Sequence, residues 1–223
     1  MPHPHDRPVW SALSGRQLAL SLGDGSARRF APDIGPLAAA RDGSAESLAA
    51  LEALVPGDGA LILLEGEDAA IVPATGVSRT ARGVQMVAGD LKAVRTLARI
   101  EPLSDADAPE MLALARLTEP GPFAARTHAL GQFWGIREAG RLAAMAGERM
   151  KPEGFAEVSG VCVHPDHRGL GHAAALSALV ADQITARGET PFLHAYADNP
   201  GAIRLYESLG FVIRCGVTVA VLG

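Results

Sequence analysis

The chain has 223 residues, of which 48% are hydrophobic and 20% are charged, and its formal net charge at pH 7 is −5. This composition indicates a compact folded protein, and the charges are too evenly spread to form a basic footprint for nucleic acid. Its two cysteines, Cys162 and Cys215, are too few for a disulfide framework and match no zinc-ligand spacing, so we expect no metal and a reducing, cytoplasmic setting.

The N-terminal sequence MPHPHDRPVW lacks the order of a signal peptide. No apolar run reaches the ~18 residues that a membrane span needs, so the sequence predicts a soluble protein without a membrane partner. Prolines flank His3 and His5 at the terminus, which favours a disordered leader over a metal-binding tail.

Over residues 1–92 the pattern predicts short apolar strand-like runs and a helix, with Gly and Asp turns between them. A helix is expected near Ser44 to Val55, and apolar runs follow at Ala60 to Leu64 and Ala70 to Val72. We therefore predict a smaller α+β region over residues 1–92, ahead of a second unit over residues 93–223.

The second unit is predicted to begin with a strand over Val94 to Ile100. Ser104 and Asp107 then give a capping-box-like helix start. Two strand-like runs, Gln132 to Arg137 and Arg141 to Ala146, are joined by Glu138-Ala139-Gly140, which is typical of a hairpin turn.

The C-terminal part predicts a regular alternation of strands and helices. Glu157 to Val163 reads as a central strand covered on both faces, and His172 to Arg187 as an amphipathic helix that ends at Gly188. Phe192 to Tyr196 is the next strand, a short helix follows through Tyr206 and Leu209, and residues 212–222 supply one or two final strands.

The stretch Arg168-Gly169-Leu170-Gly171-His172-Ala173 lies between the central strand and the long helix. A helix N-terminus has backbone N–H groups without internal partners, and glycines let an anion approach them, so the position suits a phosphate. Glycine is also common in ordinary strand-to-helix turns. Gly169-x-Gly171-x-x-Ala174 formally fits the fingerprint of a dinucleotide-binding fold too. However, the glycines come several residues after the end of the strand, and too little chain follows to build the second nucleotide-binding half of that fold.

Val161 to Ala173 resembles the pyrophosphate-binding motif of GNAT acyltransferases, with a full match to Arg-Gly-x-Gly-x-Ala. Asn199 to Phe211 is similar to the family's Asn-x-x-Ala-x-x-x-Tyr-x-x-x-Gly-Phe signature. The resemblance implies a GNAT fold of the α+β class, with a central mixed, mostly antiparallel sheet, splayed parallel strands and flanking helices. It also implies acetyl-CoA as co-substrate.

Carried over residue by residue, the resemblance assigns the co-substrate to a defined set of positions. The pantetheine arm would lie in the gap between the splayed strands and the diphosphate at the glycine turn. The implied binding residues are Val161, Cys162, Val163, Arg168, Gly169, Leu170, Gly171, His172, Ala173, Asn199, Ala202 and Tyr206.

Acyl transfer to an amine needs a base, an oxyanion donor and an acid for the departing thiolate. Tyr206 matches the family's signature tyrosine and is the candidate acid. Glu157 lies about 20 Å along the strand from Val163 at about 3.3 Å per residue, and it is the candidate base because several GNAT enzymes use a glutamate on this strand. The oxyanion donor is expected near Val161, and Cys162 is interpreted as a packing residue.

The sequence thus predicts an N-acetyltransferase that acts on a primary amine of a small molecule, amino acid or peptide. A non-catalytic acyl-CoA-binding module and a dinucleotide-binding protein remain alternatives. Residues 1–92 are compatible with a degenerate GNAT-like half, as in the glycine N-acyltransferase-like branch. The acceptor carries no recognisable signature, although Leu117 to Gly131, the hairpin and the final strands should surround it, and either a monomer or a homodimer is compatible.

Overall fold

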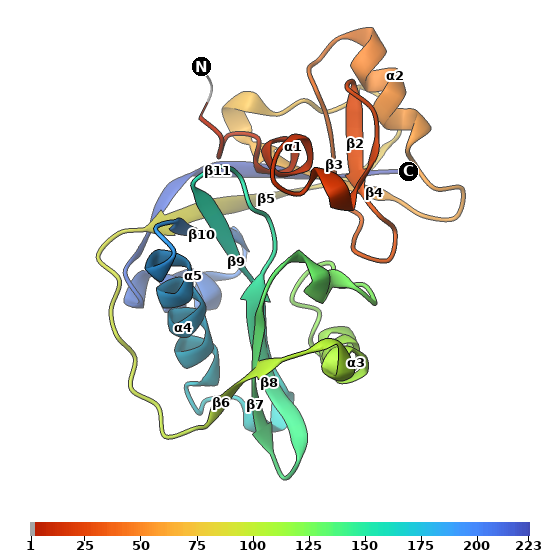
Figure 1. Ribbon diagram of the computed structural model, residues 1–223. Coiled ribbons are helices and arrows are strands. Elements are labelled where there is room, and N and C mark those ends of the chain that lie inside the picture. The colour runs from red at the N-terminus through yellow and green to blue at the C-terminus, as the bar shows by residue number, and fades with distance from the viewer. Residues whose placement is uncertain (1–2) are drawn as a thin grey trace.

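The computed structural model describes residues 3–223, and its main feature is an eight-stranded mixed sheet. The strand order is β4-β11-β5-β10-β9-β8-β7-β6, in which β9 and β10 are parallel and the other neighbours are antiparallel. Figure 1 shows the strong twist between β5 and β11 at one end and β7 and β8 at the other. The strands of this sheet are β4 (Leu61–Gly66), β5 (Val77–Ala88), β6 (Ile100–Leu103), β7 (Phe133–Glu138), β8 (Arg141–Glu148), β9 (Phe155–Val163), β10 (Thr190–Tyr196) and β11 (Phe211–Leu222).

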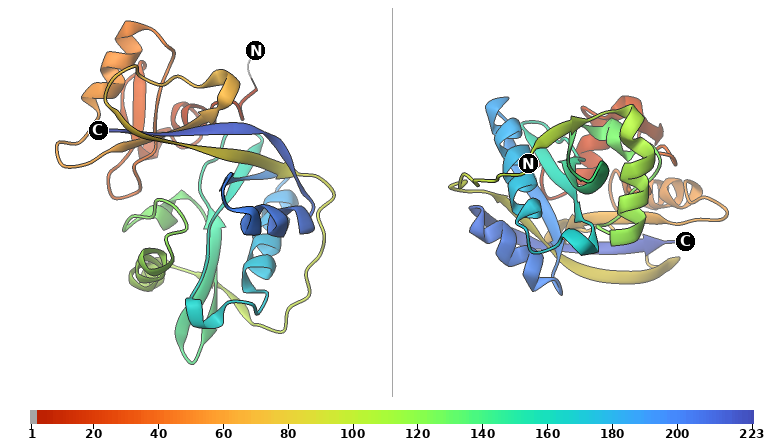
Figure 2. Two further views of the ribbon diagram at one scale, coloured as in Figure 1. Left: turned by 180° about the vertical axis from the view of Figure 1, so that it is seen from behind. Right: turned by 90° about the horizontal axis from the view of Figure 1, so that it is seen from below.

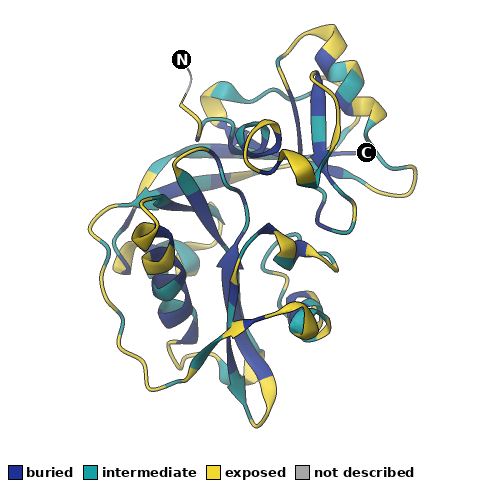
Figure 3. Cartoon of the chain, viewed as in Figure 1, coloured by how far each residue is buried: buried dark blue, intermediate teal, exposed yellow. Residues whose placement is uncertain are grey.

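Helices cover both faces of the sheet, which confirms the predicted α+β class. Both α4 and α3 pack on β8 and β9, and Figure 2 shows them on opposite sides of these strands. The buried face of α4 is turned toward the sheet and its exposed face toward solvent (Figure 3). The α-helices of the described residues are α1 (Pro8–Ser14), α2 (Ala45–Ala53), α3 (Ala108–Thr118), α4 (His172–Ala186) and α5 (Pro200–Ser208). None of them has the length and apolar character to cross a membrane.

Short elements complete the chain. A second, three-stranded antiparallel sheet has the order β1-β2-β3, with β1 (Ser21–Gly23), β2 (Ala27–Phe30) and β3 (Ala38–Ala40). Single turns of 3-10 helix are η1 (Leu18–Leu20), η2 (Glu67–Ala69), η3 (Asp105–Asp107), η4 (Thr127–Leu130) and η5 (Pro165–His167).

Two strands from the first 92 residues belong to the main sheet. β5 lies between β10 and β11 and is antiparallel to both, while β4 pairs with β11 at the sheet edge. The predicted boundary at residue 92 falls in the segment between β5 and β6, so the sheet extends across it. A division into two folding units therefore stays a prediction.

The predicted strand over Val94 to Ile100 is wrong, because β6 begins only at Ile100. The preceding segment passes outside α4 and α5 on its way from β5 to the far sheet edge, where it finds no strand to pair with (Figure 1). Val94 and Ala98 still contact the main core, whereas Leu97 is fully exposed.

The predicted disordered leader is also wrong for the described residues. The His5 side chain is fully buried between the rings of Phe155 and Phe192, at centroid distances of 3.8 and 4.4 Å. Arg7 forms an ion pair with Glu65 at 2.8 Å. The N-terminal segment is thus held against the main sheet from His3 onward; residues 1 and 2 lie outside the described part.

Local predictions around the hairpin and the helix ends are confirmed. β7 and β8 are joined at Ala139 and Gly140, with φ of 48° and 79°, which is the backbone that a tight hairpin turn requires. Ser104 and Asp107 form the expected capping box. Gly188 follows α4 with φ of 79°, as expected for a helix C-terminus.

Candidate functional site

The cavity opens where the two parallel strands separate. β9 and β10 pair only from Thr190 with Phe155 to Phe192 with Glu157, although β9 continues to Val163 and β10 to Tyr196. A cavity of about 580 Å³ lies in this gap, between α4 and α5 on one side and the end of α3 on the other. Its volume is in the range of small-ligand sites.

The glycine turn forms one end of the cavity. Gly169 and Gly171 have φ of 79° and 78°, and a Cβ on either would meet no atom within 4 Å. The glycines are thus needed for their backbone conformation and leave open space in front of it.

The backbone amides of this turn are available to a ligand. From Gly169 to Ala174 they donate to no acceptor among residues 3–223, and no side chain caps α4. The Arg168 side chain is exposed and forms no ion pair within the same residues. This group of donors fits an anion such as a diphosphate.

A β-bulge shapes the part of β9 that faces the gap. The register with β8 shifts between Met145 and Gly147, and Gly160 adopts φ of 63°. A Cβ at Gly160 would lie 2.8 Å from Cε1 of Phe133, so both the conformation and the space require glycine. Val161 consequently has no register partner on β8, which leaves its backbone next to the cavity.

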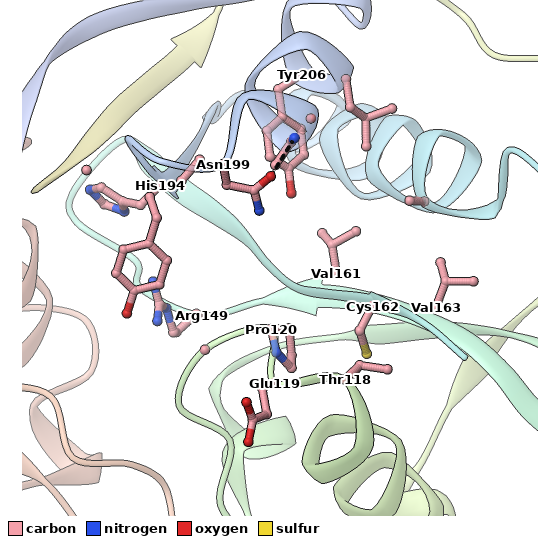
Figure 4. Close-up of a pocket in the computed structure, with 18 of the residues that line it drawn as sticks. Thr118, Glu119, Pro120, Arg149, Val161, Cys162, Val163, His194, Asn199 and Tyr206 are labelled. Carbon is pink, nitrogen blue, oxygen red and sulfur yellow. Dashed lines mark hydrogen bonds between the residues drawn. The ribbon is translucent and has the colours of Figure 1, made fainter. Parts of the chain in front are cut away.

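Side chains alternate along the end of β9. Val161 and Val163 point toward the side of α4 and Tyr206, whereas Cys162 points toward Thr118 (Figure 4). Burial raises the pKa of the Cys162 thiol to about 11, so the thiol is protonated at neutral pH. Its environment agrees with a packing residue rather than a nucleophile.

The two predicted residues of α5 face the same cavity. Asn199 caps α5 by accepting a hydrogen bond from the Ala202 amide at 3.0 Å, drawn as a dashed line in Figure 4. The Tyr206 side chain is 9% exposed, and its hydroxyl has no hydrogen-bond partner among residues 3–223. Burial, with a smaller effect of the Glu157 charge, raises the pKa of Tyr206 to about 12. The phenol therefore keeps its proton and is free to donate it to a ligand.

Glu157 lies behind the cavity wall rather than on it. Its carboxylate is fully buried and accepts from Arg149 Nε at 2.8 Å, from Arg149 Nη2 at 2.7 Å and from the Met150 amide at 3.3 Å. Oε1 also contacts Nδ1 of His194 at 2.7 Å. Burial alone would raise the pKa of Glu157, but Arg149 and His194 outweigh it and lower the pKa to about 2. Glu157 thus has no free oxygen toward the cavity.

His194 extends this buried network toward the N-terminus. The Gln85 side chain donates from Nε2 to the His5 carbonyl at 2.8 Å and lies 3.1 Å from Nε2 of His194, while its oxygen accepts from Arg214 at 2.9 Å. Since the Gln85 nitrogen is a donor, Nε2 of His194 is the acceptor and Nδ1–H donates to Glu157. Both ring nitrogens are therefore engaged.

Most predicted co-substrate residues meet at the cavity. The exception is Leu170, which points to solvent with 62% of its surface exposed. The remaining wall is made by Leu37, Ile62, Leu64, Gly83, Thr118, Glu119, Pro120, Gly121, Pro122, Arg149, His167, Ala174, His194, Ala195, Tyr196, Gly201, Leu205, Val217 and Val219. The end of α3, the last strand and the N-terminal region were expected in this wall, whereas Arg149 was not. Within residues 3–223, no group of three or more His, Cys, Asp or Glu side chains is arranged to hold a metal ion.

Comparisons with known proteins agree with this geometry. The family described as FR47-like protein matches residues 133–218. No curated protein sequence matches the chain. A crystal structure of a candidate acetyltransferase from the GNAT family of Novosphingobium aromaticivorans is 48% identical, with a TM-score of 0.90 over 99% of this chain and 98% of that chain.

More distant structures share the fold over the whole length. A GCN5-related N-acetyltransferase from Kribbella flavida is 21% identical, with a TM-score of 0.68 over 100% of this chain and 97% of that chain. A GCN5-related N-acetyltransferase-like protein from Streptococcus suis is 17% identical, with a TM-score of 0.63 over 100% and 94%. None of these names supports the narrower prediction of a glycine N-acyltransferase-like branch.

Proposed function

The chain belongs to the GNAT family of acetyltransferases, and from this premise we propose that it transfers an acetyl group from acetyl-CoA to a primary amine in a ternary complex. The observation that carries the proposal is the row of amides from Gly169 to Ala174 without a partner among the described residues, at the N-terminus of a long helix and beside two separated parallel strands. Such a row suits a diphosphate, and the gap suits a narrow arm attached to it.

We propose that the co-substrate is held mainly by backbone. The amides of the glycine turn and the Arg168 guanidinium would bind the diphosphate. The exposed edge of β9 at Val161, Cys162 and Val163 would bind the amides of the pantetheine arm, and Asn199 and Ala202 would contact the arm from α5. When bound, acetyl-CoA supplies the activated acyl group as a thioester.

Tyr206 is the proposed acid. Its hydroxyl faces the cavity without a partner in the described part of the chain, and with a pKa of about 12 it holds its proton at neutral pH. A thiol of the cysteine type has a pKa of about 8.5, so a complete transfer from the phenol is uphill. A hydrogen bond from Tyr206 to the developing thiolate still stabilises it, and this donation is the role that we propose. The proton that the attacking amine loses then restores the CoA thiol by way of solvent, so the reaction yields the amide and free CoA.

The proposed base role of Glu157 needs revision on geometric grounds. Each of its oxygens accepts from two donors, and a carboxylate with a pKa of about 2 is a weak base. We propose instead that Glu157 is a positioning residue that fixes Arg149 and the tautomer of His194. The backbone near Val161 remains the proposed donor to the oxyanion.

Two measurements test the function. Titration calorimetry with CoA and with NAD should show binding of CoA only, and a thiol-release assay with acetyl-CoA over an amine panel should show turnover. Tight binding without turnover of any amine would favour the non-catalytic binding module. Preferential binding of NAD would contradict the assignment of the glycine turn.

A further inference from the structure

The half of the cavity that the co-substrate does not need carries its own pattern of charge and apolar surface. It includes Arg149, Glu119 and an apolar wall from β4, β11 and Leu37, and His194 and Tyr196 also line the cavity. Resting on the proposed function, we propose that this half binds the acceptor, and that the acceptor is a free α-amino acid with an apolar side chain whose carboxylate is held by Arg149.

Arg149 presents one edge of its guanidinium to the cavity. Nε and Nη2 donate to Glu157, whereas Nη1 has no hydrogen-bond partner among residues 3–223. The Arg149 side chain is 12% exposed and lies on the cavity wall, but the Glu157 side chain is 1% exposed and does not. In the Arg149–Glu157 ion pair, the guanidinium therefore faces the cavity and the carboxylate does not. A guanidinium fixed along one edge can bind a carboxylate through the other.

Glu119 supplies the complementary charge. It follows α3 in the left-handed conformation, with φ of 47°, where glycine or asparagine is the usual residue. It is exposed, lines the cavity and forms no ion pair with another described residue. Figure 4 shows Glu119 and Arg149 on the same side of the cavity, across from Tyr206. A carboxylate and a guanidinium in one small site match the two charged groups of an amino acid.

The wall beside these charges is apolar. Leu64 and Val219 are register partners on β4 and β11, and Leu37, Ile62 and Val217 continue the surface. Burial of an aliphatic side chain against this wall is favourable, whereas a polar side chain would lose its water without a new partner. The wall therefore selects an aliphatic amino acid over a polar one.

The test compares matched acceptors on the unmodified protein. With saturating acetyl-CoA, thiol release is measured for leucine, leucinamide, 3-methylbutylamine and serine. We expect kcat/KM for leucine to exceed that of the other three by at least about tenfold, because only leucine offers both the carboxylate and the aliphatic side chain. Equal or faster turnover of leucinamide or the plain amine would overturn the proposal, as would a failure of leucine to react while acetyl-CoA binds.

A second arm asks which molecule carries the carboxylate. If Arg149 served the acyl group instead, succinyl-CoA would be the better donor to leucinamide, and that result would also overturn the proposal. Calorimetry distinguishes a failure of the proposed function from a failure of the proposed acceptor. Absence of CoA binding contradicts the proposed function, whereas CoA binding without a preference for leucine contradicts only the proposed acceptor.

Variants locate the effect. Arg149→Lys keeps a cation next to Glu157 but lacks the second edge, so kcat/KM for leucine should fall about tenfold or more relative to kcat/KM for leucinamide. Arg79→Met removes an exposed arginine of β5 outside the cavity and is the control. If Arg149→Lys does not fold, the comparison of acceptors on the unmodified protein decides alone.

Discussion

Replacing Gly171 by alanine tests whether the glycine turn binds the diphosphate. Gly171 is the N-terminal cap of α4 with φ of 78°, and a Cβ there would meet no atom within 4 Å. The cost is therefore conformational rather than steric, about 1 to 2 kcal/mol for an L residue in the left-handed region. The backbone can escape this cost by rotating, and rotation would turn the neighbouring amides away from the cavity.

The expected loss in affinity follows from the hydrogen bonds involved. A hydrogen bond to a charged group contributes about 1.5 to 3 kcal/mol, so misplacing one of them should raise the Kd for CoA by roughly ten- to a hundredfold. Titration calorimetry with CoA measures this directly. A thermal melt reports the accompanying loss of stability, which at about 1 kcal/mol should be ~2 to 4 °C for a chain of this size.

Gly188→Ala is the matched control for Gly171→Ala. Gly188 follows the same helix at its other end, with φ of 79° and equally open space for a Cβ. The two variants should lose similar stability, but only Gly171→Ala should lose affinity for CoA. Equal affinities in both variants, or equal weakening in both, would refute a phosphate-binding role for the turn.

Three further predictions follow from the buried side chains. Tyr206→Phe should lower kcat about a hundredfold while the Kd for acetyl-CoA stays within a few fold, and unchanged turnover would remove Tyr206 from the reaction. Because the pKa of Glu157 is lowered from 4.5 to about 2, its stabilisation is complete above about pH 4.5 and is lost as pH falls toward 2. Glu157→Gln should thus lower the free energy of unfolding by about 3 kcal/mol at pH 7 and by much less near pH 3 in urea titrations; equal losses at both pH values would contradict the linkage. Burial lowers the pKa of His5 from 6.5 to about 3. On acidification His5 is therefore protonated in the unfolded chain before it is protonated in the folded chain, and the free energy of unfolding falls as the pH drops from 6.5 toward 3. His5→Leu should reduce the stability lost between pH 7 and pH 5 by about 2 kcal/mol, and an unchanged loss would show that His5 is not the group responsible.

The proposed phosphate-binding half of the site could be nominated from sequence because its signals are local. Gly169 and Gly171 lie within a few residues of the strand and helix that position them, and backbone amides bind the anion whatever the side chains are. The second motif likewise places Asn199 and Tyr206 on one short helix. The resemblance of these two local motifs to the GNAT signatures was therefore enough to nominate these residues.

The acceptor half could not be predicted because its residues are distant in sequence. Arg149 follows β8 in a stretch without a motif, and its role depends on Glu157 across a bidentate ion pair and on His194 behind it. The family resemblance also suggested Glu157 as a base. Its burial and its four donors could not be foreseen, because they arise only when β8, β9 and β10 are assembled. β5 was missed because Arg79 and Arg82 interrupt its apolar pattern, although Met86 is fully buried.

The position of β5 between β10 and β11 has a consequence for folding during synthesis. Residues 77–88 leave the ribosome well before the strands on either side of them, which are residues 190–196 and 211–222. Until then β5 has two open edges, and the sheet that walls the cavity cannot close. The main sheet therefore stays incomplete in the nascent chain until residues 190–222 have been synthesised.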